Sequence, residues 1–329
     1  MIEIVAQSDV MREAVGLAER VANTDTNVLI TGESGAGKDA LAFYIHSRSP
    51  RAMKPFVKID CATLPGDLLE AELFGYERGA FTSAGEAKPG RLEAAHTGTV
   101  VLDEIAYLPN DSQAKLLRVI ETREFERLGG RHTIKVDARL IALTNVDLQA
   151  AVERRDFRED LFYRLNVVHI QVPSLRVRGA DLPELVQVFL NKYAAKHGRK
   201  VSTLAPEALA LLREYEFPGN VRELANTIER AVIVSHGKRI QATDFPESIR
   251  AAVLVQRHRQ KPRSLAEVEA EYLDETLEAT QGNKAAAARI LGISRKNLYE
   301  RLERKGKERA HADTEKTGEA LPDLPVGDS

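Results

Sequence analysis

Five short apolar segments, separated by amphipathic stretches, set the strongest limit on the fold of the first half of the chain. The segments are NVLIT, FVKID, TVVLD, ARLIALT and NVVHIQV, at residues 27–31, 56–60, 99–103, 138–144 and 166–172. Apolar strands that alternate with amphipathic helices form a mostly parallel sheet covered by helices. The first half therefore predicts an α/β fold, with a hairpin in EFERLGGRHTIKV (124–136) around Gly129 and Gly130, between the third and fourth of these strands.

The strand pattern stops after Pro173, and from Asp181 to about Ser235 the apolar residues follow a helical period. This change predicts a smaller all-helical domain after the sheet. QRHRQKP at residues 256–262 is polar, basic and ends in proline, as linkers do. From about Gly306 onward the chain is too polar and too often interrupted by Pro and Gly to form a core, so we expect disorder there.

Composition limits the compartment. Cys61 is the only cysteine among 329 residues, which excludes a disulfide framework and a cysteine metal cluster and favours a reducing cytosol. No run of about 18 apolar residues is present, and the N-terminus lacks a basic region followed by an apolar core. We therefore expect a cytoplasmic protein with no membrane partner.

The segment GESGAGKD lies between the apolar VLIT and the helical ALAFYIHS, where a phosphate-binding loop must lie. Its glycines let backbone N–H groups converge on phosphates, the helix N-terminus adds a positive field, and Lys38 can reach the terminal phosphates of ATP. Asp39 stands where the general motif has the Ser or Thr that holds Mg²⁺, so the metal needs oxygen ligands from elsewhere. The predicted nucleotide-binding residues are Gly32, Glu33, Ser34, Gly35, Ala36, Gly37, Lys38 and Asp39.

Two acids end the apolar segment GTVVLDEI. We expect Asp103 to bind Mg²⁺ directly or through water, and Glu104 to polarise the water that attacks ATP. Asn145 ends the next strand with a neutral amide able to orient that water. Paired acids can also simply end a strand, but a neighbouring phosphate loop favours the catalytic interpretation.

Three arginines are candidates for contact with phosphate. FREDLFYRL places Arg158 and Arg164 six residues apart, and phosphoryl transfer gains from an arginine that a neighbouring subunit can donate. Surface ion pairing is the alternative. FPGNVREL has a break at its Pro-Gly pair, a candidate helix cap at Asn220, and Arg222 in the first helical turn. A cation there opposes the helix dipole, so we expect Arg222 to have another partner such as phosphate.

The segment 264–306 predicts a helix, a short helix, a turn and a third helix. Gly282 and Asn283 break the pattern after the first helix, Gly292 supplies the turn, and Ser294 caps the third helix. That third helix exposes basic residues and suits the major groove of DNA, although an oligomerisation hairpin would be the alternative. The predicted base contacts are Arg295, Lys296 and Asn297, and the predicted phosphate contacts are Arg301 and Arg304.

Taken together and in this order, GESGAGKD, ELFGYERGAFTSA, GTVVLDEI, FREDLFYRLNV and FPGNVREL resemble an AAA+ ATPase. More narrowly, they resemble the sigma-54-dependent transcriptional activators, the bacterial enhancer-binding proteins of the NtrC family, over roughly residues 5–245. The C-terminal unit resembles the Fis-type helix-turn-helix of these activators, whose first helix also dimerises. An acid after the loop lysine, as at Asp39, is typical of the family.

The resemblance implies a P-loop parallel sheet with a helical lid, followed by an all-α DNA-binding domain. It divides the chain into an AAA+ α/β subdomain, the lid, a linker, a helix-turn-helix domain and a disordered tail, at residues 1–172, 173–250, 251–263, 264–306 and 307–329. The implied function is ATP-dependent transcriptional activation: the chain binds double-stranded enhancer DNA as a dimer, assembles into a hexameric ring and remodels the sigma-54 RNA polymerase holoenzyme. One alternative is a regulator of ordinary promoters for which ATP is only an assembly ligand. Another is an AAA+ remodeller of a different protein, which the DNA-binding end only tethers.

The resemblance also assigns a role to the loop of Gly79, Ala80, Phe81, Thr82, Ser83 and Ala84, which corresponds to the family's contact with sigma-54. Phe81 would be the apolar contact, unless it folds back as a plug of the loop. Ser83 replaces the family's usual glycine, which restricts the backbone there. Asp60 stands where the family usually has an asparagine that restrains the catalytic glutamate. Neighbouring carboxylates repel unless a cation or a shared proton intervenes, so we expect an altered restraint.

Overall fold

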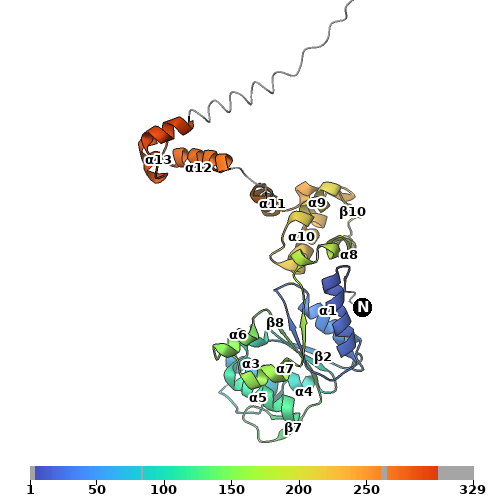
Figure 1. Ribbon diagram of the computed structural model, residues 1–329. Helices are drawn as coiled ribbons and strands as arrows, with labels where there is room; N and C mark the ends of the chain where they lie inside the picture. The colour runs from blue at the N-terminus through green and yellow to red at the C-terminus, as the bar shows by residue number, and fades with distance from the viewer. Residues whose placement is uncertain (1–3, 83, 261–264, 303–329) are drawn as a thin grey trace, which may run out of the picture. The chain divides into compact units, whose positions relative to one another are not determined.

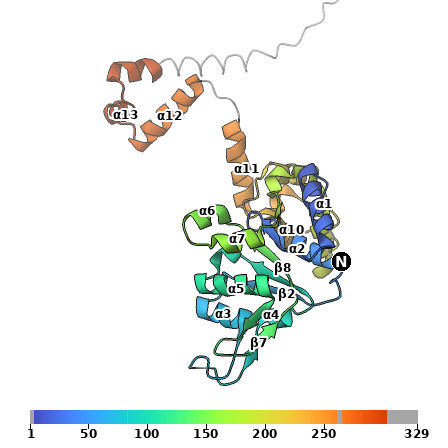
Figure 2. The ribbon, with the colours of Figure 1, turned by 60° about the horizontal axis from the view of Figure 1, so that its bottom comes forward.

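The computed structural model describes residues 4–82, 84–260 and 265–302. The chain divides after Val253 into two compact units. Figures 1 and 2 show a sheet with helices on both faces in the first unit, and short helices in the second.

The first unit is built on a five-stranded parallel sheet in the order β2-β5-β8-β1-β9. The strands are β1 (Val28–Thr31), β2 (Phe56–Asp60), β5 (Thr99–Asp103), β8 (Arg139–Thr144) and β9 (Val168–Gln171). Each lies within one of the five apolar segments, so the predicted α/β fold is confirmed. Because β1 is flanked by β8 and β9, the loop that follows it emerges beside the ends of its neighbours, at the carboxyl edge where ligands bind in such sheets.

Side chains alternate between the two faces of each strand, so the sheet has two hydrophobic cores. Val28 and Ile30 pack with α1 (Asp9–Ala22) and α2 (Lys38–Ser47) on one face. Leu29 packs on the other face with a group of five helices. These are α3 (Gly66–Phe74), α4 (Arg91–Ala94), α5 (Asn110–Thr122), α6 (Leu148–Glu153) and α7 (Glu159–Leu165).

The remaining elements of this half are short. The predicted hairpin is present as β6 (Glu124–Glu126) and β7 (Thr133–Lys135), which pair antiparallel. β3 (Gly75–Tyr76) and β4 (Lys88–Pro89) pair antiparallel at the two ends of the candidate sigma-54 loop. The helix η1 (Ile105–Tyr107) follows Glu104.

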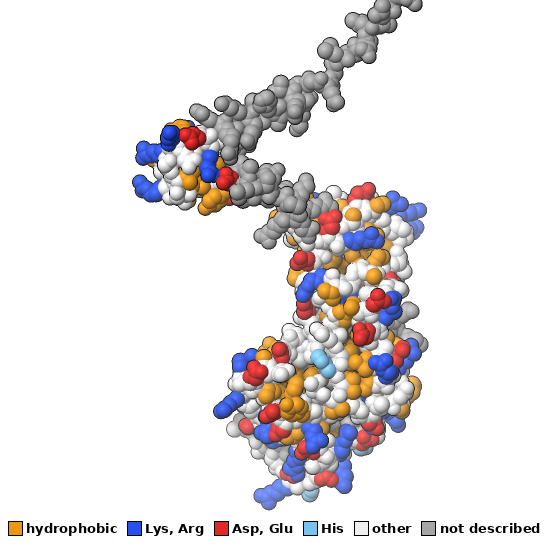
Figure 3. All heavy atoms as spheres, in the orientation of Figure 1, with side chains coloured by type: hydrophobic (Ala, Val, Ile, Leu, Met, Phe, Trp, Pro, Cys, Tyr) orange, Lys and Arg blue, Asp and Glu red, His pale blue; other side chains and the backbone are white. Residues whose placement is uncertain are grey.

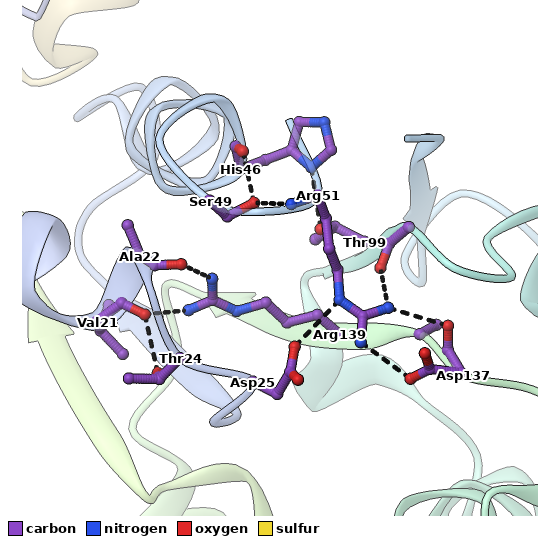
Figure 4. A network of polar contacts seen from close by, with 12 residues as sticks. Val21, Ala22, Thr24, Asp25, His46, Ser49, Arg51, Thr99, Asp137 and Arg139 are labelled. Carbon is purple, nitrogen blue, oxygen red and sulfur yellow. Dashed lines mark hydrogen bonds and ion pairs between the residues drawn. The ribbon is translucent and has the colours of Figure 1, made fainter. Parts of the chain in front are cut away.

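A polar cluster lies at the amino edge of the sheet, opposite the phosphate loop, and is drawn in Figure 4. Arg139 at the start of β8 is 1% exposed, and its two Nη atoms donate to the carbonyl oxygens of Ala22 and Val21 at 2.8 and 2.7 Å. These carbonyls end α1, so the guanidinium caps a helix C-terminus where a cation is favourable. Beside it, Arg51 forms ion pairs with Asp25 and Asp137.

The predicted helical domain follows β9 and packs around a core of its own. Its helices are η2 (Leu175–Val177), η3 (Gly179–Asp181), α8 (Leu182–Lys196), α9 (Pro206–Glu214), α10 (Asn220–Val234) and η4 (Ala242–Asp244). The strands β10 (Thr203–Leu204) and β11 (Arg239–Ile240) form a parallel pair there that the sequence pattern did not reveal. Two-residue strands carry too little periodicity to be recognised.

Helix α11 (Glu247–Gln260) continues through residues 251–260 of the expected linker, so this part of the linker is helical. The second unit contains α12 (Leu265–Ala279), α13 (Lys284–Ile290) and a further helix at residues 295–302. The rest of the expected linker (261–263), Ser83, Arg304 and the expected tail (307–329) lie outside the described residues. No helix formed by the described residues is long and apolar enough to span a membrane.

Candidate active site

The phosphate loop connects β1 to α2 in the conformation that its glycines permit. Gly35 and Gly37 have φ of 74° and 111°, values that strain residues with a Cβ atom. Lys38, the first residue of α2, is 7% exposed, and its ammonium donates to the carbonyl oxygen of Gly32 at 2.8 Å. The same ammonium lies 3.7 Å from Glu104 Oε1. The loop lysine and the acid after β5, far apart in sequence, therefore meet.

A cavity of about 400 Å³ opens over this loop. Its wall combines the loop, the acids at the strand ends and the lid. The polar and glycine residues that line it are Ser34, Gly35, Gly37, Lys38, Asp39, Asp60, Asp103, Glu104 and Arg222, with Ala40, Phe189, Val221 and Ala225 as the apolar part. Most of the predicted nucleotide-binding and catalytic residues of the sheet subdomain thus face one space.

The acids reach the cavity because β2 and β5 end together. Asp60 lies opposite Asp103 in the parallel register. Glu104 comes next and has φ 52° and ψ 49°, a left-handed conformation that costs a non-glycine residue about 1 kcal/mol or more. Glu104 Oε2 accepts a hydrogen bond from the backbone N–H of Asn145 at 3.2 Å. Asn145 is thus tied to Glu104 through its main chain, and it lines a neighbouring pocket instead of this cavity.

Lys58, which the sequence motifs did not single out, pairs with two acids that line the cavity, Asp103 and Asp39. Its ammonium lies 2.7 Å from Asp103 Oδ2 and also forms an ion pair with Asp39. Burial lowers the pKa of Lys58, but the hydrogen bonds to Asp103 and Asp39 outweigh burial and leave that pKa above its usual value. Because side chains alternate along a strand, residues 58 and 60 lie on the same face of the sheet. This alternation was the one sign in the sequence that Lys58 could lie near the acids.

Cys61 lies directly after Asp60 and is buried. Burial, and then the charges of Asp60, Asp103 and Glu104, raise the pKa of its thiol to about 12. The thiol therefore stays protonated near neutral pH, which makes it a poor nucleophile and a poor metal ligand.

The lid is fastened to the phosphate loop by side chains. Asn220 does not cap α10 as expected: the cap position is Gly219, and Asn220 itself has φ 53°. Its amide instead accepts from Leu175 N at 2.8 Å and donates to Glu33 Oε2 and Ser34 O, both at 3.1 Å. The carboxylate of Glu33 also pairs with Arg176, whose hydrogen bond, followed by that of Asn220, lowers the pKa of Glu33. Glu33 thus holds the lid.

Arg222 contacts the phosphate loop through its side chain and its backbone. Its Nη1 donates to Ser34 Oγ at 3.1 Å, and its backbone N–H donates to Gly35 O at 3.3 Å. A Cβ atom at Gly35 would lie 2.4 Å from the carbonyl oxygen of Gly219. The first turn of α10 therefore lies directly against the phosphate loop, with a guanidinium at the cavity wall.

Arg158 and Arg164 are not brought to this cavity within the chain. Arg158 precedes α7 and pairs with Asp160 at 2.7 Å, and Arg164 pairs with Glu121 at 3.1 Å. Their side chains are 44% and 60% exposed. Both arginines are therefore presented at the surface.

The loop that follows β3 is a compact turn. Gly79 N donates to Ala84 O at 2.8 Å, and Ala84 N donates to Phe81 O at 2.9 Å. Phe81 is 37% exposed, and its ring centroid lies 4.8 Å from that of Tyr76. Phe81 is thus half exposed and supported by a second aromatic ring.

The second unit has its own small core around Leu273, Ala287 and Leu298. Asn283 caps α13 by accepting from Ala285 N and Ala286 N, and Ser294 Oγ accepts from Asn297 N at 3.2 Å, as expected for a cap. Arg295, Lys296 and Asn297 are exposed, and basic side chains gather on one side of this unit in Figure 3. Arg301 pairs with Glu269 of α12 at 2.7 Å.

Three family models match the chain in order. They are described as Sigma-54 interaction domain, AAA+ ATPase lid domain, and Bacterial regulatory protein, Fis family, and they match residues 4–171, 176–262 and 264–304. The chain belongs to the sigma-54-dependent transcriptional activators. Its first unit is an AAA+ nucleotide-binding ATPase domain, and its C-terminal unit is a Fis-type DNA-binding domain.

Curated relatives agree with this placement. The activator is 46% identical over 311 residues to the regulatory protein AtoC of Escherichia coli K12, covering 92% of the chain and 68% of AtoC. It is 44% identical over 301 residues to the transcriptional regulatory protein ZraR of the same strain, again covering 92% and 68%. It is 42% identical over 315 residues to FlbD of Caulobacter vibrioides, covering 91% and 69%.

Solved structures give the same fold. NtrX from Brucella abortus in complex with ADP superposes with a TM-score of 0.70 and 36% identity, covering 92% of the activator and 69% of NtrX. The ATP complex of NtrX gives a TM-score of 0.69 and 38% identity over 92% and 68%.

Proposed function

We propose that this activator hydrolyses ATP in the cavity over the phosphate loop and uses the cycle to remodel sigma-54 RNA polymerase at promoters whose upstream DNA it binds. The observation that carries the proposal is the meeting of Lys38 with Glu104 at 3.7 Å in a cavity that the lid residue Arg222 also lines. A loop lysine, an acid able to activate water, and a lid guanidinium are the groups that phosphoryl transfer from ATP needs.

The chemistry divides between the two acids after β5. Glu104 is the base that orients and deprotonates the attacking water, and Asn145 holds its carboxylate through the backbone hydrogen bond. Asp60 faces the same cavity and is proposed to restrain Glu104. Lys38 and Arg222 bind the phosphates, and the backbone N–H groups of the loop surround them.

A Mg²⁺ ion fits this donor set. Carboxylate oxygens of Asp103, with Asp39 or Asp60 nearby, are the hard ligands that Mg²⁺ takes. Among the described residues, no three His, Cys, Asp or Glu side chains form a complete metal-binding group. Mg²⁺ usually keeps several waters and takes phosphate oxygens from the nucleotide, so one or two carboxylates are enough to hold it. When bound, the ion supplies charge neutralisation on the phosphates.

The exposed arginines support an assembly. Arg158, directly before α7, and Arg164, within α7, are exposed and do not line the cavity of their own chain. We infer that they complete the active site of a neighbouring subunit in a ring, and the family resemblance makes that ring a hexamer. The chain then acts as a dimer on DNA and as a hexamer on polymerase, in the cytoplasm.

Phe81 is the proposed anchor on sigma-54. It is half exposed and lies between Ala80 and Thr82, in the turn that the hydrogen bond from Gly79 N to Ala84 O closes. An aromatic side chain at such a contact is worth a few kcal/mol. Ser83 completes the proposed contact loop.

The C-terminal unit supplies DNA binding through Arg295, Lys296 and Asn297, with phosphate contacts from Arg301 and Arg304. The ion pair of Arg301 with Glu269 leaves it half exposed, which suits a backbone contact better than a base contact. We retain 1–172, 173–250, 251–263 and 264–306 as the proposed domain borders, followed by the tail 307–329.

The direct test is transcription in vitro from a sigma-54 promoter with wild-type protein and Glu104→Gln. Wild type should open the promoter with ATP and fail with a non-hydrolysable analogue. Glu104→Gln should bind ATP as wild type does and hydrolyse it at least about 100-fold more slowly. Normal turnover in Glu104→Gln would remove Glu104 from the mechanism, and ATP-independent activation would favour a regulator for which ATP is only an assembly ligand.

The assignment of Arg158 and Arg164 is tested by mixing. Each Arg→Ala variant alone should be inactive, and mixing it with inactive Glu104→Gln should restore part of the ATPase activity, because mixed interfaces then carry an intact pair. No recovery at any ratio would show that the arginines act within their own subunit or do not act. Phe81→Ala should keep ATPase activity and lose sigma-54 binding.

A further inference from the structure

The acids of the proposed Mg²⁺ site are partly neutralised by a lysine that the catalytic motifs do not contain. Lys58 comes from the middle of β2, and its ammonium lies between Asp39 on α2 and Asp103 at the end of β5. It is 38% exposed, whereas Asp103 is 14% exposed. Lys58 is not itself a lining residue, but it pairs with two of the acids that line the cavity.

Both oxygens of Asp103 already have donors. Oδ1 accepts from the backbone N–H of Glu104 at 3.1 Å, and Oδ2 pairs with Lys58 at 2.7 Å. Asp39, the acid that replaces the usual hydroxyl ligand, shares the same ammonium. A carboxylate oxygen has two lone pairs, so a metal ion or its water can still be accepted, but its positive charge then lies close to that of Lys58.

The net charge of the cavity gives the lysine a second effect. Four acids line it, namely Asp39, Asp60, Asp103 and Glu104, against the two cations Lys38 and Arg222. Nucleotide phosphates would meet an excess of negative charge there. Lys58 cancels part of that excess through its ion pairs with Asp39 and Asp103.

We propose that Lys58 is a built-in counter-cation that competes with Mg²⁺ for Asp39 and Asp103 and lets nucleotide bind with less dependence on the metal. This inference rests on the proposed nucleotide site and adds a residue that sets its metal requirement. Lys58 is a positioning residue in this role, because it is argued to act on metal and nucleotide through Asp39 and Asp103.

The test compares wild type with Lys58→Met, which keeps the length of the side chain and removes the charge. Calorimetry measures ADP affinity in EDTA, and electron paramagnetic resonance of Mn²⁺ measures metal binding in the presence of ADP. Lys58→Met should bind ADP roughly three- to tenfold more weakly in EDTA and bind Mn²⁺ roughly three- to tenfold more tightly, as expected for one partly screened charge. Lys58→Arg should stay within about twofold of wild type in both measurements.

Lys135→Met is the matched control, because Lys135 also lies on a strand and pairs with one acid, Glu124, but is 82% exposed and belongs to the hairpin. It should change neither measurement. Lys58→Gln repeats the test if Lys58→Met fails to fold.

Three results would overturn the proposal. Weaker Mn²⁺ binding in Lys58→Met would mean that Lys58 only holds Asp103 in place for the metal. Unchanged affinities in Lys58→Met, with wild type binding both ligands, would remove Lys58 from the site while leaving the proposed function intact. Failure of wild type to bind ADP with or without Mn²⁺ would overturn this inference and the proposed function together.

Discussion

Charged residues lie at both the amino and the carboxyl edge of the parallel sheet, but their surroundings differ. At the amino edge, Arg139 and Arg51 are held by backbone carbonyls and by the acids Asp25 and Asp137 (Figure 4). At the carboxyl edge, Lys38, Asp103 and Glu104 line an open cavity instead. The charged groups at the amino edge are enclosed by protein partners, whereas those at the carboxyl edge also face a cavity that can take a ligand.

The difference follows from what each edge must do. The C-terminus of α1 leaves carbonyls without helical partners, and a buried carbonyl without a donor is costly. Arg139 supplies that donor. At the other edge, Glu104 adopts a left-handed backbone conformation, which lowers the stability of the folded state. Lys38 donates to a carbonyl of its own loop, at the place where a phosphate is expected. Mutations at the amino edge should therefore lower mainly the free energy of unfolding, and mutations at the carboxyl edge should weaken mainly nucleotide binding.

The largest effect is expected from Arg139→Ala. It removes the guanidinium donors from the carbonyls of Val21 and Ala22, of which Val21 keeps those of Thr24, and it creates a cavity in the core. The free energy of unfolding should therefore fall by roughly 3–5 kcal/mol in urea titrations. ADP affinity of the folded protein should stay within about twofold of wild type. Arg139→Met refills the volume, and full recovery with Met would show that the hydrogen bonds matter little. A large loss of ADP affinity would show that the amino edge also contributes to nucleotide binding.

Lys38→Met should give the reverse pattern. ADP binding measured by calorimetry should weaken by about 100-fold or more, because the charge that meets the terminal phosphates is gone. The unfolding free energy without nucleotide should change by less than about 1 kcal/mol, since the ion pair with Glu104 is long, at 3.7 Å, and Met keeps the length of the buried side chain. A Lys38→Met protein that keeps its affinity would show that the loop backbone alone binds the phosphates.

Arg51→Gln should have an intermediate effect at the amino edge. It removes ion pairs with Asp25 and Asp137 whose acids are 68% and 62% exposed, so solvent screening limits their worth. Hydrogen bonds to the carbonyls of Gly98 and Asp137 are lost as well. We expect about 1–2 kcal/mol less stability in urea titrations. A loss as large as that of Arg139→Ala would mean that the cluster acts as one network.

The smallest effect concerns pH. Burial, and then the charge of Arg139, lower the pKa of His46 from its ordinary 6.5, so the folded state favours the neutral ring. The unfolded chain then binds more protons once the pH falls below about 6.5, and the His46 contribution to stability declines with falling pH, by at most about 1.4 kcal/mol per pH unit. Urea titrations at several pH values should show a shallower decline in His46→Gln. Equal slopes would exclude this role.

Much of the fold follows from local pattern. The segment VLIT followed by GESGAGKD and ALAFYIHS places a strand, a loop and a helix correctly, because apolar runs and glycines specify backbone conformation over a few residues. The sequence did not predict the strand pair β10 and β11, because two-residue strands show no periodicity. It also did not predict that α11 continues to Gln260, because a polar segment can extend a helix that is anchored elsewhere.

The candidate site was predictable to the extent that its residues lie in contiguous motifs. Lys38, Asp103, Glu104 and Arg222 were all expected, and they share one cavity. Asn220 was expected to cap a helix, but it ties the lid to Glu33. Lys58 went unnoticed because a single lysine in a strand has no motif, and its value depends on Asp39 and Asp103 arriving beside it.

The sequence by itself determined the kind of chemistry, since the order of a glycine loop, a pair of acids and a basic C-terminal helix admits few functions. Only the tertiary structure decided which charges are partnered and which face the cavity. Pairing depends on distances between segments far apart in the chain, such as Arg139 with Val21 or Lys58 with Asp103. Those distances are fixed by strand order and register, which a linear pattern does not encode.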